Sequence, residues 1–358
     1  MKKSKKIILI IAIVILIIII AIAGCCYYLT TPVSNDSESV VLTVEEGSTF
    51  SDVAKLLKEN ELIHSEAFFM LYAKLKNVDE LYAADYTFRP NMNLDLILET
   101  LKAGGNSNNE EITITFQEGI NMRRIATIIS ENTTNAYEDV FEVLEDEEYL
   151  DTLIANYWFL TDEIKNKDIY YPLEGYLFPD TYNFSSKNAG VKEIFEVMLD
   201  QMDVVLTPYK EAITNSSYSV HELLTLASLV ELEGVYEEDR KNIASVFYNR
   251  LSSGMSLGSD VTTYYAIKVD LHERDLYQSE LDAYNPYNTR GPQMEGKLPV
   301  GPVASPSKMS IEAAIYPNTT DYLYFVADKN RQVYFTKTDL EHQQMIDDLI
   351  DRGLWYEW

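Results

Sequence analysis

The alternation of apolar and polar positions divides the chain into an apolar N-terminal segment, a short polar stretch and a long mixed region. Residues 7–23 are all apolar, and no charged residue occurs in residues 7–29. A helix that crosses a bilayer needs about 20 apolar residues. We therefore expect a transmembrane helix over residues 7–29, followed by a linker at residues 30–40, whose small and polar composition is typical of a tether.

A strand–turn–helix pattern occurs twice in the region that follows. In each copy a short alternating stretch leads into a Glu-Gly pair, at Glu46-Gly47 and at Glu118-Gly119, and then into a helical pattern of apolar residues. Glycine permits the tight turn that joins the two elements. The unit resembles the LysM-like module of cell-wall proteins, and we expect a LysM-like subdomain at residues 41–135. The alternative is a repeat that serves packing alone.

The remaining residues, 136–358, combine helical periodicity with a hairpin pattern. Apolar spacing predicts helices at residues 191–205, 221–233 and 238–251, and alternation predicts paired strands near residues 322–326 and 332–335. Helices interleaved with hairpins are typical of an α+β domain. The expected fold class is therefore α+β, with the anchor and the LysM-like subdomain preceding a mixed α+β domain at residues 136–358.

The distribution of charge predicts how the chain is oriented in the membrane. The lysines of the first six residues precede the apolar segment, and all 57 acidic residues follow it. Because flanking lysines stay on the cytoplasmic side, we expect residues 1–6 in the cytoplasm and the rest outside it, in a single-pass cell-membrane protein. The formal net charge of −28 argues against binding to nucleic acid.

Cysteine usage limits both the anchor and the possible cofactors. Cys25 and Cys26 are the only cysteines and are adjacent, so a disulfide framework and a cysteine-ligated metal site are excluded. The sequence Ile22-Ala23-Gly24-Cys25 resembles a lipoprotein processing site, and a lipidated Cys25 is the alternative to a spanning helix. We find no phosphate-binding loop and no metal-ligand cluster, and we expect no cofactor.

The candidate chemistry lies in the helix predicted at residues 221–233, which is apolar around most of its circumference. Burial disfavours an ionised carboxylate, so we expect a raised pKa for Glu231, which suits a general acid near neutral pH. Glu233 points to the opposite side and is interpreted as a partner of Arg240 or Arg250. The helix alone does not establish an enzyme, because a glutamate on an apolar helix is more often paired than catalytic.

The helix is one of several ordered blocks that together resemble one family. Ala227-Ser228-Leu229-Val230-Glu231-Leu232-Glu233 is similar to the signature of the endolytic murein transglycosylases, the YceG-like family, in which the first glutamate of the pair is catalytic. Further blocks occur at residues 173–182, 243–257, 259–260, 287–289, 298–302, 310–314, 322–328 and 338–342. The positions that depart from the family pattern are Leu232, Gly258, Val261 and Val333.

The resemblance implies an enzyme that cuts the β-1,4 bond between N-acetylmuramic acid and N-acetylglucosamine in nascent peptidoglycan, close to membrane synthases. Glu231 would act as acid and base, would leave 1,6-anhydro ends, and would thereby terminate strand elongation. We expect supporting roles for Glu174 and Asp260. The side chains expected to contact sugar are those of Ser228, Tyr287 and Asn288.

Two other functions remain open at this point. One is a hydrolytic muramidase, which would use Glu231 together with a second acid such as Glu174 or Asp260. The other is a non-catalytic wall-binding scaffold that uses the LysM-like region to position a peptidoglycan synthase.

Overall fold

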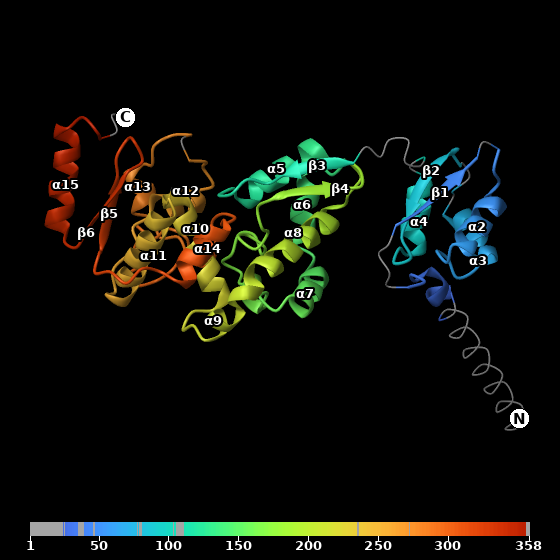
Figure 1. Ribbon diagram of the computed structural model, residues 1–358, viewed down its shortest axis with the longest axis horizontal. Coiled ribbons are helices and arrows are strands. Elements are labelled where there is room, and N and C mark those ends of the chain that lie inside the picture. The colour runs from blue at the N-terminus through green and yellow to red at the C-terminus, as the bar shows by residue number, and fades with distance from the viewer. Residues whose placement is uncertain are drawn as a thin grey trace, which may run out of the picture. The chain divides into compact units, whose positions relative to one another are not determined.

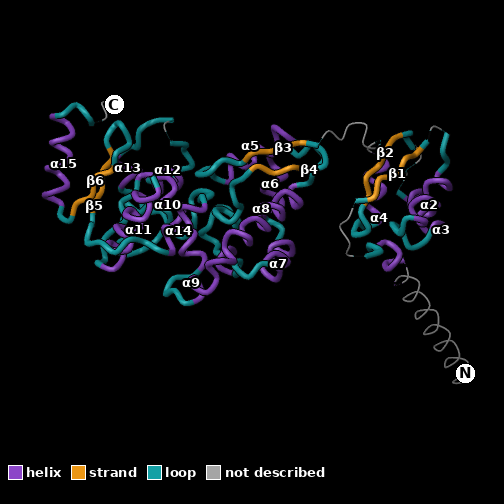
Figure 2. Tube along the Cα trace, viewed as in Figure 1, coloured by secondary structure: helices purple, strands orange, loops and turns teal. Residues whose placement is uncertain are grey.

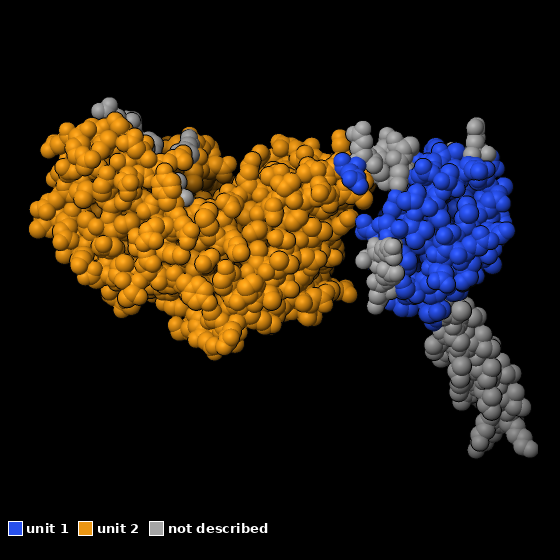
Figure 3. All heavy atoms as spheres, viewed as in Figure 1, with its two compact units in different colours: residues 1–111 blue, residues 112–358 orange. Residues whose placement is uncertain are grey.

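The computed structural model describes residues 24, 26–34, 39–45, 47–76, 78, 81–102, 104, 111–234, 236–271 and 273–355. The chain forms two compact units, residues 1–111 and residues 112–358 (Figure 3). The cytoplasmic tail expected at residues 1–6 and nearly all of the helix expected at residues 7–29 lie outside the described residues. Within the ranges given above, every helix is too short or too polar to span a bilayer.

In the described residues from Val40 onward, unit 1 combines strands with helices (Figure 1). In chain order they are β1 (Val40–Val44), α2 (Phe50–Glu59), α3 (Glu66–Leu75), β2 (Ala84–Phe88) and α4 (Leu94–Lys102). The strands pair antiparallel, with Leu42 opposite Tyr86. Helix α2 starts at a capping box, in which Thr49 and Asp52 each accept a backbone N–H of the other residue. The strand–turn–helix expected from the first copy of the repeat is confirmed.

The first half of unit 2 has a similar order, with a further α-helix and a 3-10 helix before its second strand. It contains β3 (Ile112–Thr115), α5 (Met122–Asn132), α6 (Tyr137–Leu144), α7 (Glu147–Asn156), η2 (Asp162–Lys165), β4 (Thr181–Phe184) and α8 (Val191–Leu206). Strands β3 and β4 pair antiparallel, with Ile114 opposite Tyr182. The units divide between residues 111 and 112 instead of at the expected 135–136, because β3 and α5 bury Ile114, Ile125 and Ile129 in the core of unit 2.

The second half of unit 2 is mainly helical and ends in a hairpin and a helix (Figure 2). It contains η3 (Thr207–Tyr209), α9 (Lys210–Thr214), α10 (Val220–Glu233), α11 (Glu237–Ser252), α12 (Asp260–Ala266), α13 (Gln278–Leu281), α14 (Lys308–Ile315), β5 (Tyr324–Ala327), β6 (Val333–Thr336) and α15 (Asp339–Asp351). Strands β5 and β6 form the predicted hairpin. The mixture of helices with two-stranded sheets confirms an α+β fold.

Helix α10 is the central helix of this half, because it packs against both α11 and α14. Its apolar residues are enclosed all round, as the sequence pattern predicted; they include Leu223, Leu226, Leu229 and Val230. The loop at residues 299–307 runs beside the helix. His221 contacts Val300 near the start of α10, and Ser228 contacts Val303 further along it. This loop therefore lies along α10 and leads into the start of α14.

Glu174 is a buried carboxylate that joins three segments of unit 2. Both of its oxygens accept the backbone N–H of Met122 at 3.0 Å, at the start of α5, and one accepts the Tyr265 hydroxyl at 2.9 Å. The start of a helix favours a negative charge. Burial nevertheless dominates and raises the pKa of Glu174 to about 7, although the bonds from Met122 and Tyr265 oppose the rise.

We predict that Glu174 makes the stability of the protein fall as pH rises toward neutrality. A carboxyl whose pKa is higher in the folded than in the unfolded state stabilises the fold below its unfolded pKa, and this contribution is lost as pH rises through the folded pKa. Between about pH 5 and pH 7 the loss is about 2 kcal/mol. Urea unfolding at several pH values should show a flatter dependence for Glu174→Gln. An unchanged slope in the variant would contradict this prediction.

Gly175 is required where its turn meets the 299–307 loop. It has φ +78, and a Cβ there would lie 2.3 Å from Pro302 Cβ. We predict that Gly175→Ala destabilises the protein by roughly 2 kcal/mol or more, from backbone strain and overpacking combined. Gly254 has φ +66 with no atom within 4 Å of such a Cβ, so Gly254→Ala measures the backbone cost alone. Equal losses in the two variants, measured by urea unfolding, would rule out the contact with Pro302.

Candidate active site

Glu231 lies in the last turn of α10, and its side chain is only 6% exposed. One carboxylate oxygen accepts a hydrogen bond from Arg240 Nη2 at 2.9 Å, and the other accepts the backbone N–H of Ser307 at 2.8 Å. Ser307 is the residue that caps the start of α14, where the helix favours a negative charge. Three helices, α10, α11 and α14, therefore determine where this carboxylate lies.

Arg240 holds this arrangement together from the first turns of α11. Its side chain is 7% exposed, and besides Glu231 it donates to the Ser307 hydroxyl at 3.0 Å and to the Gly234 carbonyl at 3.3 Å. A Cβ on Gly234 would lie 2.6 Å from Arg240 Cγ, so glycine leaves room for the arginine. One guanidinium thus links the end of α10 to the start of α14.

The structure corrects part of what we expected of the two glutamates of α10. Glu231 is enclosed, as predicted, but the interpretation of Glu233 as the partner of Arg240 or Arg250 was wrong, because Arg240 pairs with Glu231. Glu233 instead accepts the Ser259 hydroxyl at 2.7 Å. Burial raises the pKa of Glu233, while the Ser259 bond opposes the rise. Arg250 donates to backbone carbonyls, including that of Leu323.

The turn between β3 and α5 brings a second acidic residue to this site. The N–H of Gly119 donates to the Ser305 carbonyl, and the N–H of Ser305 donates to the Ile120 carbonyl, both at 2.8 Å. A Cβ on Gly119 would lie 3.8 Å from Glu231 Cγ, so the turn packs directly against the glutamate. The preceding residue, Glu118, is exposed. The second copy of the sequence repeat therefore forms part of the wall beside Glu231.

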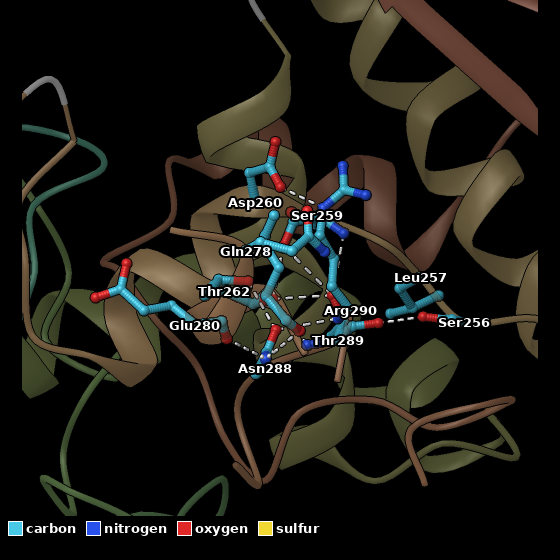
Figure 4. A network of polar contacts seen from close by, with 12 residues as sticks. Ser256, Leu257, Ser259, Asp260, Thr262, Gln278, Glu280, Asn288, Thr289 and Arg290 are labelled. Atoms are coloured by element: carbon cyan, nitrogen blue, oxygen red, sulfur yellow. Dashed lines mark hydrogen bonds and ion pairs between the residues drawn. The ribbon is translucent and has the colours of Figure 1, made fainter. Parts of the chain in front are cut away.

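The two carboxylates expected to support Glu231 serve other contacts in this structure. The hydrogen bonds of Glu174 go to Met122 and Tyr265, within the core. Asp260 forms an ion pair with Arg290, and the Asp260 side chain is 54% exposed (Figure 4). Neither hydrogen-bonds to Glu231 in the described part of the chain. The raised pKa of Glu174 lies in the range of a general acid. Its side chain, however, is buried and joins structural elements.

The side chains expected to contact sugar are buried and already bonded. Ser228 donates to the Thr225 carbonyl and accepts the Val303 N–H. Tyr287 is fully enclosed, and its hydroxyl accepts the Tyr170 N–H at 3.1 Å. In this structure their polar atoms bind the protein itself, and sugar contact by Ser228 and Tyr287 stays a prediction.

Asn288 lies in a network that joins α12 to the loop after α13 (Figure 4). Its amide nitrogen donates to three backbone carbonyls, those of Glu280, Leu281 and Ala283, and its oxygen accepts the Thr263 hydroxyl at 2.7 Å. These bonds use both ends of the amide, and contact of Asn288 with sugar stays a prediction. The network shapes the loop that carries Arg290.

A cavity of about 540 Å³ lies at the other end of α10. Its lining includes His221 and Thr225. His221 precedes Glu231 by ten residues, which correspond to about 15 Å of helix. Both ring nitrogens of His221 are bonded, to the Tyr176 hydroxyl and the Val300 carbonyl. In the ranges that the structure describes, no group of three or more His, Cys, Asp or Glu side chains is placed to hold a metal ion. This cavity therefore lies away from the Glu231 carboxylate.

Three residues of the site were not found from the sequence: Arg240, Ser307 and Glu118. Arg240 follows Glu231 across a helix–turn–helix, so the pairing depends on the angle between α10 and α11. Glu118 did carry a signal, because the Glu-Gly pair recurs in both copies of the repeat. We interpreted that pair only as a turn.

Comparison with known proteins agrees with this geometry. The model of the YceG-like family matches residues 42–348. An endolytic murein transglycosylase of Bacillus subtilis is 38% identical over 315 residues, which cover 87% of this chain and 86% of that protein. A protein of the same name from Streptococcus pneumoniae serotype 2 is 33% identical over 338 residues, which cover 90% of this chain but 60% of the relative.

A solved structure has the same fold. The crystal structure of a yceG-like protein from Listeria monocytogenes is 34% identical and has a TM-score of 0.61, with 86% of this chain and 99% of that chain covered. The family match extends over most of unit 1 and nearly all of unit 2. The chain therefore belongs to the YceG-like family, the family of the endolytic murein transglycosylases.

Proposed function

We propose that this protein is an endolytic lytic transglycosylase that cleaves the β-1,4 bond between N-acetylmuramic acid and N-acetylglucosamine in nascent peptidoglycan. The observation that carries the proposal is the enclosed carboxylate of Glu231, held between Arg240 and the start of α14. Glu231 is the residue that matches the catalytic glutamate of the family signature. Relatives named endolytic murein transglycosylase support the reaction class.

In the proposed reaction Glu231 first acts as a general acid and then as a general base. Protonated Glu231 gives its proton to the bridging oxygen, and the bond from that oxygen to C1 of the muramyl sugar breaks. The C6 hydroxyl of the same sugar then attacks C1, and its proton passes to the Glu231 carboxylate. The product is a 1,6-anhydro end, formed without water, whereas a muramidase would produce a reducing end.

The ion pair with Arg240 has a specific role in the first of these steps. When the proton leaves Glu231, a full negative charge appears on an enclosed side chain, and an unpaired buried charge is costly. Arg240 and the Ser307 N–H are already placed to stabilise that charge, so the protein need not reorganise during the transfer. They also keep the carboxylate from turning away from the substrate.

The same proposal includes a location for the reaction. Residues 7–29 would anchor the chain in the cell membrane, with residues 1–6 in the cytoplasm and both units outside it. The lysines before the apolar segment support this orientation. Unit 1, with its strand–helix–helix–strand order, would act as a LysM-like module. Cutting new strands beside membrane synthases would terminate the elongation of those strands.

We predict that Glu231→Gln abolishes cleavage, with a loss of about 10³-fold or more, because the amide cannot exchange the proton. The purified protein is incubated with peptidoglycan strands, and the released ends are analysed by mass spectrometry. Wild type should produce anhydro-muramyl ends. Reducing ends would instead favour the muramidase, and absence of cleavage by the wild type would favour the scaffold. Glu237→Gln, which changes an exposed glutamate on α11, serves as the matched control.

A second prediction concerns Arg240. Arg240→Met should lower activity by at least about 10²-fold and destabilise the fold by about 3 kcal/mol, because it leaves the Glu231 carboxylate enclosed without its partner. The double variant with Glu231→Gln removes the stranded charge and should regain most of the lost stability, though not the activity. Urea unfolding and the strand assay measure the two effects. If the double variant is as unstable as Arg240→Met, the ion pair is not the source of the loss.

A further inference from the structure

The Glu118-Gly119 turn is held at the active site by backbone contacts. The Gly119 N–H donates to the Ser305 carbonyl, and the Ser305 N–H donates to the Ile120 carbonyl, each at 2.8 Å. A Cβ on Gly119 would lie 3.8 Å from Glu231 Cγ and 3.5 Å from Leu232 Cδ2. The residue before this glycine is therefore placed close to Glu231 by the main chain, without a bond of its own side chain.

The charges around Glu118 show that its carboxylate belongs to the same electrostatic site. Partial burial raises the pKa of Glu118, and the charge of Glu231 raises it further. The Arg240 guanidinium opposes the rise, while Asp180 adds to it. These charged groups face Glu118 from α10, from α11 and from the segment before β4. Glu118 itself is exposed, whereas the side chains of Glu231 and Arg240 are enclosed.

The exposure of Glu118 determines what it can contact. Glu231 and Arg240 satisfy each other within the wall of the site, while Glu118 presents its carboxylate to the solvent beside them. A glycan strand whose bridging oxygen reaches Glu231 must approach from the solvent side, because the other sides of the carboxylate are occupied by α11 and α14. A sugar bound there would meet Glu118.

We propose that Glu118 is a second carboxylate of the active site, which contacts the muramyl ring and stabilises the positive charge that develops on it. The proposal rests on the function proposed above for Glu231. Glu118 acts in its ionised form and makes no bond to the sugar. It differs in this from the second acid of a hydrolase, which activates water or attacks C1.

The step remains balanced when Glu118 is included. The proton of Glu231 goes to the bridging oxygen, and the electrons of the broken C1–O bond go with that oxygen. The muramyl ring is positive until its C6 oxygen bonds to C1, and the hydroxyl proton returns to Glu231. A negative charge within about 5 Å of that ring lowers the energy of the charged stage more than that of the neutral substrate.

The first test separates turnover from binding in the full-length protein. Glu118→Gln should lower kcat by about 10- to 100-fold with little change in KM, because the charge acts on the transition state. Glu118→Asp keeps the charge on a shorter side chain, and its kcat should lie between that of the wild type and that of Glu118→Gln. Glu46→Gln alters the corresponding residue of the first copy of the repeat and should leave kcat unchanged.

The second test is the pH dependence of kcat, which a purely structural role would not alter. Because the pKa of Glu118 is raised, its protonation begins closer to neutrality than for an ordinary glutamate. Wild-type activity should therefore fall as pH is lowered through that pKa. Glu118→Gln should lose this acidic limb of the profile, and Glu118→Asp should keep it.

The outcomes distinguish this inference from the proposed function. Wild-type kcat in Glu118→Gln, or equal losses in Gln and Asp variants with the acidic limb unchanged, would overturn the role of Glu118. If Glu231→Gln is inactive at the same time, the function of Glu231 stands. Cleavage by Glu231→Gln would overturn the proposed function itself. Unfolding midpoints of all variants show whether a loss of activity reflects a loss of folding.

Discussion

The ion pair between Glu231 and Arg240 is the interaction on which the rest of the site depends. Both side chains are almost fully enclosed, at 6% and 7% exposure, and a buried charge without a partner is strongly destabilising. The pair therefore requires α10, α11 and α14 to meet at one point. The small residue at Gly234 and the cap at Ser307 serve the same contact. The position of the Glu231 carboxylate is thus determined by the packing of the domain.

The pair also imposes a chemical constraint, because in the proposed reaction Glu231 must carry a proton before it donates one, and its partner Arg240 is a cation. The negative charge of Glu118 partly offsets the positive charge of Arg240, since both lie close to Glu231. A site with two carboxylates and one guanidinium has a net negative charge. In the proposed reaction, such a site would stabilise a cationic ring beside it better than a neutral ion pair alone would.

The sequence predicted much of the fold but little of the site beyond Glu231. The spacing of apolar residues predicted α10 and the β5–β6 hairpin, because the pattern of buried residues within one element depends on local spacing. The partners of Glu231 depend on the angles between helices, which local spacing does not contain. For the same reason the sequence does not show which protein groups Ser228 and Asn288 bond to, because those partners are distant along the chain.

The second copy of the repeat contributes its turn to the site around Glu231. Both copies place a glutamate and a glycine between a strand and the helix that follows. In unit 2 the loop at residues 299–307 pairs with that turn, and Gly119 lies next to Glu231. Gly119 has φ +76, a backbone conformation that favours glycine, and a Cβ there would make only ordinary van der Waals contact with Glu231. The turn then presents Glu118 beside Glu231.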